Sequence, residues 1–199
     1  MLIQGLIWAT LFSTVSVLVA EQVQSTDRTI RIELVAGRPP SEVYKLWTTE
    51  AGVTKWFAPA ARVDPRVGGR YEIIFDPATD PDGSVRGTKG AKILELVPDK
   101  KLVFEWIAFE GQERAGYGGP PVMPEPERSR EKTRVEVVFE PAPGDVSKTR
   151  IVLVHNGFRE GATWDAALVY FRERGWPGVL RQLTEYCNQG ILPAWSKRQ

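Results

Sequence analysis

Cysteine and histidine are nearly absent from this chain of 199 residues, which contains one of each, Cys187 and His155. A single cysteine cannot form an intramolecular disulfide, and the pair cannot supply a zinc site of the Cys/His kind. A serine or cysteine hydrolase triad would need His155 as its base, and no nucleophile-elbow motif is present. Cys187 falls in an apolar helical stripe, so we interpret it as an inert core thiol.

Neither sign of charge dominates the chain, because its 26 basic residues nearly cancel its 25 acidic ones. A nucleic-acid-binding protein needs a basic stripe or patch, so we expect no nucleic-acid partner. The glycine-rich stretch 83–90 lacks the spacing of a phosphate-binding loop. The acidic stretch 76–83 lacks the glutamate that closes a calcium loop at its twelfth position. The sequence therefore indicates no metal and no cofactor.

The first twenty residues contain no charged side chain, and Glu21 directly follows Ala20. An apolar segment that ends at a small residue is typical of an export signal. We therefore expect residues 1–20 to be a cleaved signal peptide and the protein to be periplasmic or secreted. A retained membrane anchor and a buried core helix are the alternatives. With one cysteine, an exported chain must be stabilised by its core, which seven Trp and eight Phe can supply.

Apolar and polar residues alternate in several stretches, which predicts β-strands with one apolar face. These stretches are 28–37, 68–76, 90–109 (two strands joined at Pro98-Asp99), 133–140 and 149–158. Two stretches of helical spacing, 38–50 and 51–59, follow the first strand, and we expect Ser41 to be the N-cap of the first helix.

The last element, from about Thr163 to Gly190, has a helical apolar stripe that "RGWPG" interrupts. Since proline is tolerated in the first turn of a helix, we expect a break near Gly175 and a new helix with Pro177 in its first turn. A sheet with one apolar face must bury it, and this long helix is the only predicted element large enough. The sequence thus predicts an α+β domain over residues 28–190, with a pocket between sheet and helix.

Residues 110–131 are rich in glycine, proline and charge and lack apolar periodicity. We interpret them as a long surface loop between two strands. The loop is either an insertion without function or a flap over the pocket, with Tyr117, Val122 and Met123 as contacts.

Six stretches in order carry a resemblance to a known family: "RPPSEVYKLWTTEAGVTKWFAP", "RVGGRYEIIF", "DGSVRGTKGAKILELVPDKKLVFEW", "TRVEVVFEP", "TRIVLVHNGF" and "GWPGVLRQLTEY". From Arg28 to about Tyr186 the chain resembles the family named for the C-terminal domain of the activator of heat-shock-protein-ninety ATPase. This family belongs to the START-like, birch-pollen-allergen-like (SRPBCC) superfamily.

The resemblance implies a helix-grip fold, a curved antiparallel sheet around a long C-terminal helix with a hydrophobic cavity between them. Superfamily relatives bind lipids, sterols or other apolar molecules, and some act as cyclases or hydrolases. Two departures affect what can be carried over. The 110–131 stretch is longer than the family's usual connection, and an export signal disagrees with a cytosolic, ATP-linked chaperone role.

We therefore expect the protein to bind a small apolar molecule or lipid, with no contact to the membrane except through residues 1–20 if they are retained. The expected lining consists of the inward-facing side chains Trp56, Tyr71, Ile73, Phe75, Phe104, Trp106, Val137, Phe139, Leu153, His155, Phe158, Trp176 and Leu180. Two other functions are left open: a cyclase- or hydrolase-type enzyme, and a protein-binding module that acts through residues 110–131.

His155 shares its strand parity with Ile151 and Leu153, so we expect it to point inward. The turn signal Asn156-Gly157 places it at the end of the strand. We therefore expect a partly exposed imidazole with one ring nitrogen free for a ligand. The alternatives are a general acid or base, and a strand-end residue with neither role.

Overall fold

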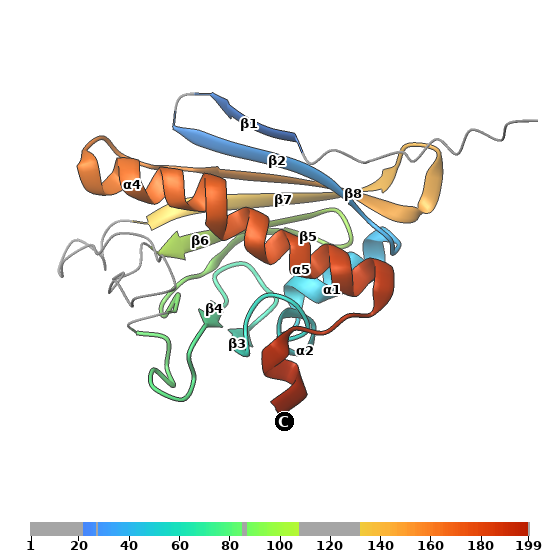
Figure 1. The fold of residues 1–199 in the computed structure, drawn as a ribbon, viewed down its shortest axis with the longest axis horizontal. Coiled ribbons are helices and arrows are strands. Elements are labelled where there is room, and N and C mark those ends of the chain that lie inside the picture. The colour runs from blue at the N-terminus through green and yellow to red at the C-terminus, as the bar shows by residue number, and fades with distance from the viewer. Residues whose placement is uncertain (1–21, 27, 85–86, 108–131, 199) are drawn as a thin grey trace, which may run out of the picture.

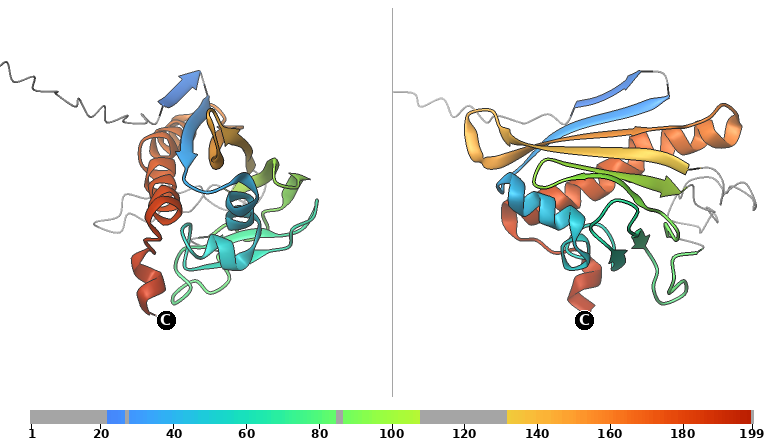
Figure 2. Two further views of the ribbon diagram at one scale, coloured as in Figure 1. Left: turned by 90° about the vertical axis from the view of Figure 1, so that its right-hand side faces the viewer. Right: turned by 180° about the vertical axis from the view of Figure 1, so that it is seen from behind.

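The computed structural model describes residues 22–26, 28–84, 87–107 and 132–198. They form a six-stranded antiparallel sheet, a small two-stranded sheet, and a long C-terminal helix that crosses one face of the large sheet (Figures 1 and 2). The strands are β1 (Gln22–Thr26), β2 (Thr29–Ala36), β3 (Ala60–Val63), β4 (Tyr71–Ile74), β5 (Ile93–Val97), β6 (Lys101–Ile107), β7 (Lys132–Ala142) and β8 (Asp145–Asn156). The helices are α1 (Pro40–Thr48), α2 (Glu50–Val53), α4 (Ala162–Tyr170), the π-helical η1 (Phe171–Gly175), α5 (Trp176–Gln189) and the 3-10 helix η2 (Ala194–Arg198).

The large sheet has the strand order β1-β2-β8-β7-β6-β5, so its last strand in sequence lies near its centre. In β2 and β7 the burial alternates residue by residue, because successive side chains point to opposite faces. The buried face packs under the C-terminal helix. This arrangement confirms the predicted α+β helix-grip fold.

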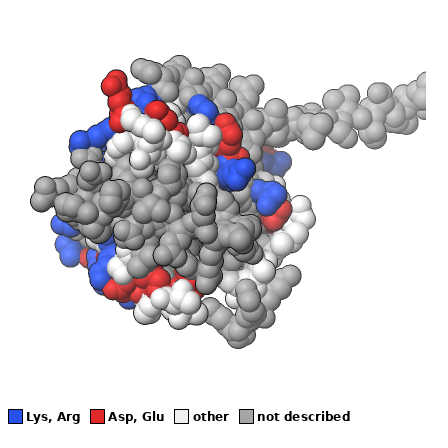
Figure 3. Space-filling model, turned by 60° about the vertical axis from the view of Figure 1, so that its left-hand side comes forward, with Lys and Arg blue, Asp and Glu red and all other residues white. Residues whose placement is uncertain are grey.

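The outer face of the sheet carries ion pairs between neighbouring strands. Arg150 on β8 bonds to Glu33 on β2 at 2.7 Å and to Glu140 on β7 at 2.6 Å, and Lys132 bonds to Glu105 at 2.7 Å. Both signs are also interspersed on the face drawn in Figure 3. Exposed ion pairs of this kind add little stability. These charges decide which face of the sheet is buried, because a charged outer face leaves only the other face to form the core.

The start of α1 differs from the prediction. Its N-cap is Pro39, and no side chain caps it, so Ser41 is not the cap. Pro40 lies in the first turn, where its missing N–H leaves no bond unmade. Strands β1 and β3 were not predicted, because their sequences, QVQST and AARV, do not alternate between apolar and polar residues.

The C-terminal helix also differs, because residues 162–189 are helical throughout where a break was expected near Gly175. One π-helical turn takes the place of the break, and the Trp176 N–H donates to the carbonyl of Phe171, five residues back. A wider turn at this point accommodates Pro177, which lacks an N–H and whose ring clashes with the preceding turn of a regular α-helix. The placement of Pro177 in the first turn of α5 is confirmed.

The π turn decides which side chains face the sheet. Residues five apart in a regular α-helix point about 140° away from each other. Phe171 and Trp176 have this spacing, yet both are buried in the core. The extra residue in the turn brings both rings to the same side of the helix. Further along the helix, Cys187 is buried as predicted, and burial raises the pKa of its thiol to about 12.

We predict that Gly52 is required where α2 packs on α1. A Cβ at this position would lie 2.3 Å from the Lys45 carbonyl oxygen and 2.7 Å from the Leu46 Cα, and backbone atoms cannot swing aside. Gly52→Ala should therefore lower the free energy of unfolding by roughly 1–3 kcal/mol. Denaturant titration followed by circular dichroism measures this loss.

Gly178 in α5 is the matched control, because a Cβ there meets nothing within 4 Å. Gly178→Ala should raise the stability by about 0.5–1 kcal/mol, since alanine loses less backbone entropy in a helix. Equal unfolding midpoints for the two variants would contradict the assigned packing of α2.

Candidate functional site

The candidate site is built around His155, which joins three elements of the fold. The indole Nε1–H of Trp176 on α5 donates to His155 Nδ1 at 2.9 Å. Because Nδ1 accepts, the neutral ring carries its proton on Nε2, which donates to Thr133 Oγ1 at 2.7 Å. The Thr133 hydroxyl in turn donates to the carbonyl of Trp106 at 3.1 Å. One continuous chain of hydrogen bonds therefore runs from α5 through β8 and β7 to β6.

The pairing of the strands positions this chain. In the register of the sheet, His155 lies opposite Ile30 on one side and Val135 on the other, while Thr133 lies opposite Trp106. Thr133 and Val135 are two residues apart, so their side chains point to the same face as His155. The inward orientation predicted for His155 is confirmed.

Two other expectations for His155 are wrong. The side chain is fully buried, with 0% exposed, instead of partly exposed at a pocket mouth. Both ring nitrogens bond to protein groups, so neither is free for a ligand. Burial disfavours the charged imidazolium and lowers the pKa of His155 to about 3. The ring is thus neutral at physiological pH.

Aromatic rings enclose His155 within the core. The Phe158 ring centroid lies 4.4 Å from that of the imidazole, the Phe171 centroid 5.2 Å and the Trp176 centroid 5.8 Å. The interplanar angles are between 53° and 88°, the tilted and edge-on geometries that aromatic pairs prefer. His155 therefore lies in an apolar, ring-lined environment.

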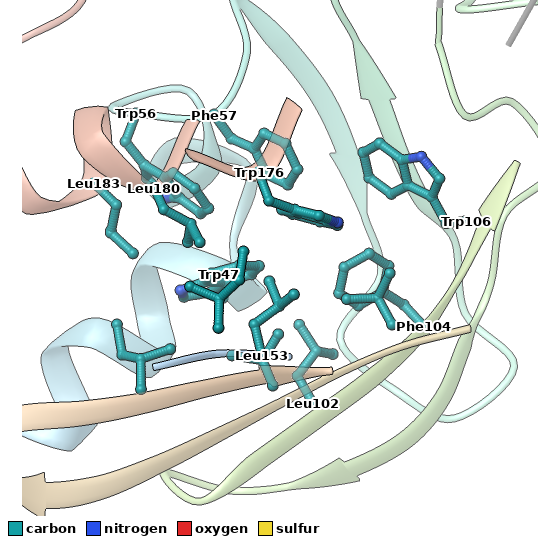
Figure 4. Packing of buried hydrophobic residues seen from close by; sticks show 14 of the residues in the cluster. Trp47, Trp56, Phe57, Leu102, Phe104, Trp106, Leu153, Trp176, Leu180 and Leu183 are labelled. Atoms are coloured by element: carbon teal, nitrogen blue, oxygen red, sulfur yellow. The ribbon is translucent and has the colours of Figure 1, made fainter. Parts of the chain in front are cut away.

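The structure brings the predicted lining residues together in one layer between sheet and helix. Apart from Phe75, which is partly buried and packs against the layer, all are buried. Figure 4 shows Phe104 and Trp106 from β6 beside Trp176, and Leu180 on the helix above Leu153. The positions predicted from strand parity are therefore contiguous, although their contact with a ligand stays a prediction.

Sequence reasoning missed four members of this layer: Trp47, Phe57, Thr133 and Phe171. Phe57 stacks on Trp106 with a centroid distance of 5.7 Å and an interplanar angle of 6°. Trp47 was placed on an apolar helical stripe, but nothing in that spacing shows that its ring reaches the centre of the core. The parity of Thr133 with the valines of β7 was the available signal for its inward orientation.

Trp47 is distinguished by an unsatisfied donor. Its side chain is fully buried, and its Nε1–H has no hydrogen-bond partner among the described residues. A buried donor without an acceptor destabilises a protein by about 1–3 kcal/mol. The Trp47 backbone carbonyl, in contrast, accepts the Tyr71 hydroxyl at 2.9 Å. The Trp47 indole N–H is thus a buried donor to which the described part of the chain offers no acceptor.

A curved antiparallel sheet closed by one long helix over an aromatic interior defines the helix-grip class of START-like proteins. Within this class, residues 38–188 match the model of the family described as Activator of Hsp90 ATPase homolog 1-like protein. The match spans more than half of the chain, which therefore belongs to this family. Comparison with curated proteins found no match.

Solved structures share the fold at low sequence identity. Protein MLL2253 from Mesorhizobium loti is 20% identical with a TM-score of 0.57, over 83% of this chain and 100% of that one. The Aha1 dimer from Colwellia psychrerythraea is 18% identical with a TM-score of 0.54, over 81% and 97%. CalU16 from Micromonospora echinospora is 19% identical with a TM-score of 0.53, over 89% and 88%. These similarities support the architecture alone.

Two predicted segments, 1–20 and 110–131, lie outside the described residues. Within the described ranges, every helix is too short or too polar to cross a bilayer. Those ranges also contain no cluster of three or more His, Cys, Asp or Glu side chains suited to a metal ion.

We predict that His155 makes stability fall as the pH falls from 7 to 5. Burial lowers the pKa of its imidazole to about 3 in the folded chain, from an ordinary value of 6.5. In this window the unfolded chain takes up a proton at His155 and the folded chain does not. Linkage then lowers the free energy of unfolding by about 2 kcal/mol. Urea unfolding at both pH values measures the change.

His155→Gln is the control, because it removes the imidazole from both states and should abolish most of this loss. The single histidine provides a second readout if that variant does not fold. The imidazole proton signals of the folded wild type should not titrate between pH 8 and pH 5. A midpoint near 6.5 would contradict the buried, neutral ring.

Proposed function

We propose that this protein binds a small apolar or amphipathic molecule between its sheet and its C-terminal helix. Ligand binding is frequent in the SRPBCC fold family to which the chain belongs. The observation that supports it here is the layer of aromatic side chains that face one another across this interface. Such a layer gains roughly 25 cal/mol for each Å² of apolar ligand surface removed from water.

The geometry of His155 disfavours the enzyme hypothesis. A general acid or base must reach substrate with a ring nitrogen and must change protonation near the working pH. Both nitrogens of His155 are engaged, and burial holds its pKa near 3. Its hydrogen bonds go to Thr133 and Trp176, neither of which is a carboxylate that could form a catalytic pair. We therefore assign His155 the role of fixing the helix on the sheet.

The site of action that we propose is outside the cytoplasm. The support is the uncharged segment 1–20, which is typical of an export signal. A protein-binding role for residues 110–131 is not part of the proposal, because that segment lies outside the described residues.

Binding of an environment-sensitive apolar dye tests the proposal. We expect about one dye per protein, and Val137→Phe should weaken its binding at least tenfold, because Val137 is fully buried on the inner face of β7. Extraction with organic solvent and mass spectrometry then identify any natural ligand.

Val138→Phe is the matched control, since the next residue on the strand points to the outer face. It should leave the dye affinity within twofold of wild type. Circular dichroism of both variants confirms that the fold is kept. Equal affinities for the two variants would place the dye elsewhere and refute the proposed site.

Export makes a separate prediction about the amino terminus. Cleavage after Ala20 would leave Glu21 as the first residue and keep β1, which begins at Gln22 and pairs with β2. N-terminal sequencing of the protein from a periplasmic or secreted fraction should therefore begin at or near Glu21. Full-length chain in the cytosol would reject the export proposal without affecting the ligand site.

A further inference from the structure

The indole N–H of Trp47 differs from those of three other tryptophans, each of which donates to a group of the protein. Trp56 donates to the Leu46 carbonyl at 3.1 Å, Trp176 to His155 at 2.9 Å and Trp195 to the Thr54 carbonyl at 3.2 Å. Trp47 is as buried as Trp56, yet its Nε1–H has no partner among the described residues. Buried polar groups in native proteins are almost always bonded, so this donor calls for an acceptor from outside.

The surroundings of Trp47 are apolar. Its ring contacts Trp56 at a centroid distance of 4.5 Å and Phe139 at 6.2 Å. In Figure 4 the indole nitrogen lies on the side of the ring that faces away from Phe104 and Trp106, below Leu180 and Leu183 of α5. A molecule held between α1 and α5 would therefore meet leucine side chains and one N–H group.

The chemistry of this donor limits what it can bind. An indole N–H can only donate, so its partner must carry an acceptor oxygen or nitrogen. Three ionisable groups buried in this core are uncharged at neutral pH, because burial raises the pKa of Tyr71 and Cys187 and lowers that of His155. An ionised carboxylate among these uncharged groups would be strongly disfavoured. A neutral acceptor such as a ketone, ester or ether oxygen meets both conditions.

We propose that Trp47 is the polar anchor of the binding site and that the ligand is a neutral, mainly apolar molecule whose carbonyl or ether oxygen accepts the Trp47 Nε1–H. This assignment rests on the proposed function and narrows it, because it excludes ionised fatty acids as ligands and makes one hydrogen bond the orienting contact.

The first experiment compares two probes that differ only in the acceptor. 2-Decanone and its isosteric alkene, 2-methyl-1-decene, are each titrated against bound dye at neutral pH. Trp47→Phe should weaken ketone binding about fivefold more than alkene binding, the scale of one hydrogen bond. Trp56→Phe is the control, because its N–H already bonds within the protein. It should weaken both probes to the same extent. Decanoate should not compete.

The second experiment uses the wild-type protein, so it does not depend on the folding of any variant. The Trp47 indole N–H gives one of the tryptophan signals in a ¹⁵N–¹H spectrum, and its absence from the spectrum of Trp47→Phe assigns it. If that variant does not fold, specific labelling and aromatic contacts to Phe139 assign it instead. The N–H proton should move downfield with ketone and stay in place with alkene.

The outcomes separate this inference from the proposed function. If ketone and alkene both bind but neither moves the Trp47 signal, apolar binding stands and the Trp47 anchor is overturned. Decanoate that binds as tightly as the ketone also overturns the neutral-acceptor assignment. If neither probe displaces the dye, the proposed function fails and the anchor fails with it.

Discussion

The hydrogen bond from Trp176 to His155 ties the C-terminal helix to the middle of the sheet, within a mainly apolar core. It can form only if the imidazole is neutral and its Nε2–H has an acceptor, which Thr133 supplies. Each group in the chain then has a partner, so the buried polar atoms do not weaken the core. The position of the helix over the sheet, and with it the aromatic layer, depends on this arrangement.

The π turn in the C-terminal helix orients Trp176 so that it can form this hydrogen bond. A regular helix through Phe171 and Trp176 would direct one of the two rings away from the sheet. Because the turn contains an extra residue, Phe171 contacts His155 from one side while Trp176 reaches its nitrogen from another. Pro177, which disfavours a regular turn, is therefore compatible with the fold and helps to explain where the helix widens. Such turns are frequent at functional sites, and this one lies against the proposed ligand layer.

Much of the fold could be predicted because the strands of the large sheet are long enough for alternation to show. Stretches 28–37, 133–140 and 149–158 each matched a strand, and the long apolar stripe matched the helix that covers them. The failures have local causes. Strands β1 and β3 lack apolar–polar alternation in QVQST and AARV. The chain enters α1 through Pro39, so Pro39 is the cap. A helix with a π turn and two helices separated by a break show the same spacing of apolar residues. The sequence pattern of residues 163–190 therefore could not distinguish between them.

The sequence by itself determined which side chains share a face, because side-chain parity along a strand follows from the backbone. That was enough to place His155 inward and to collect the aromatic lining. Its burial, its tautomer and its pKa were decided only by the tertiary structure, which brought Thr133 and Trp176 to its two nitrogens from distant parts of the chain. The unsatisfied N–H of Trp47 likewise has no local signature. Whether a buried donor finds an acceptor depends on what packs across from it, and the Trp47 ring packs against the rings of Trp56 and Phe139.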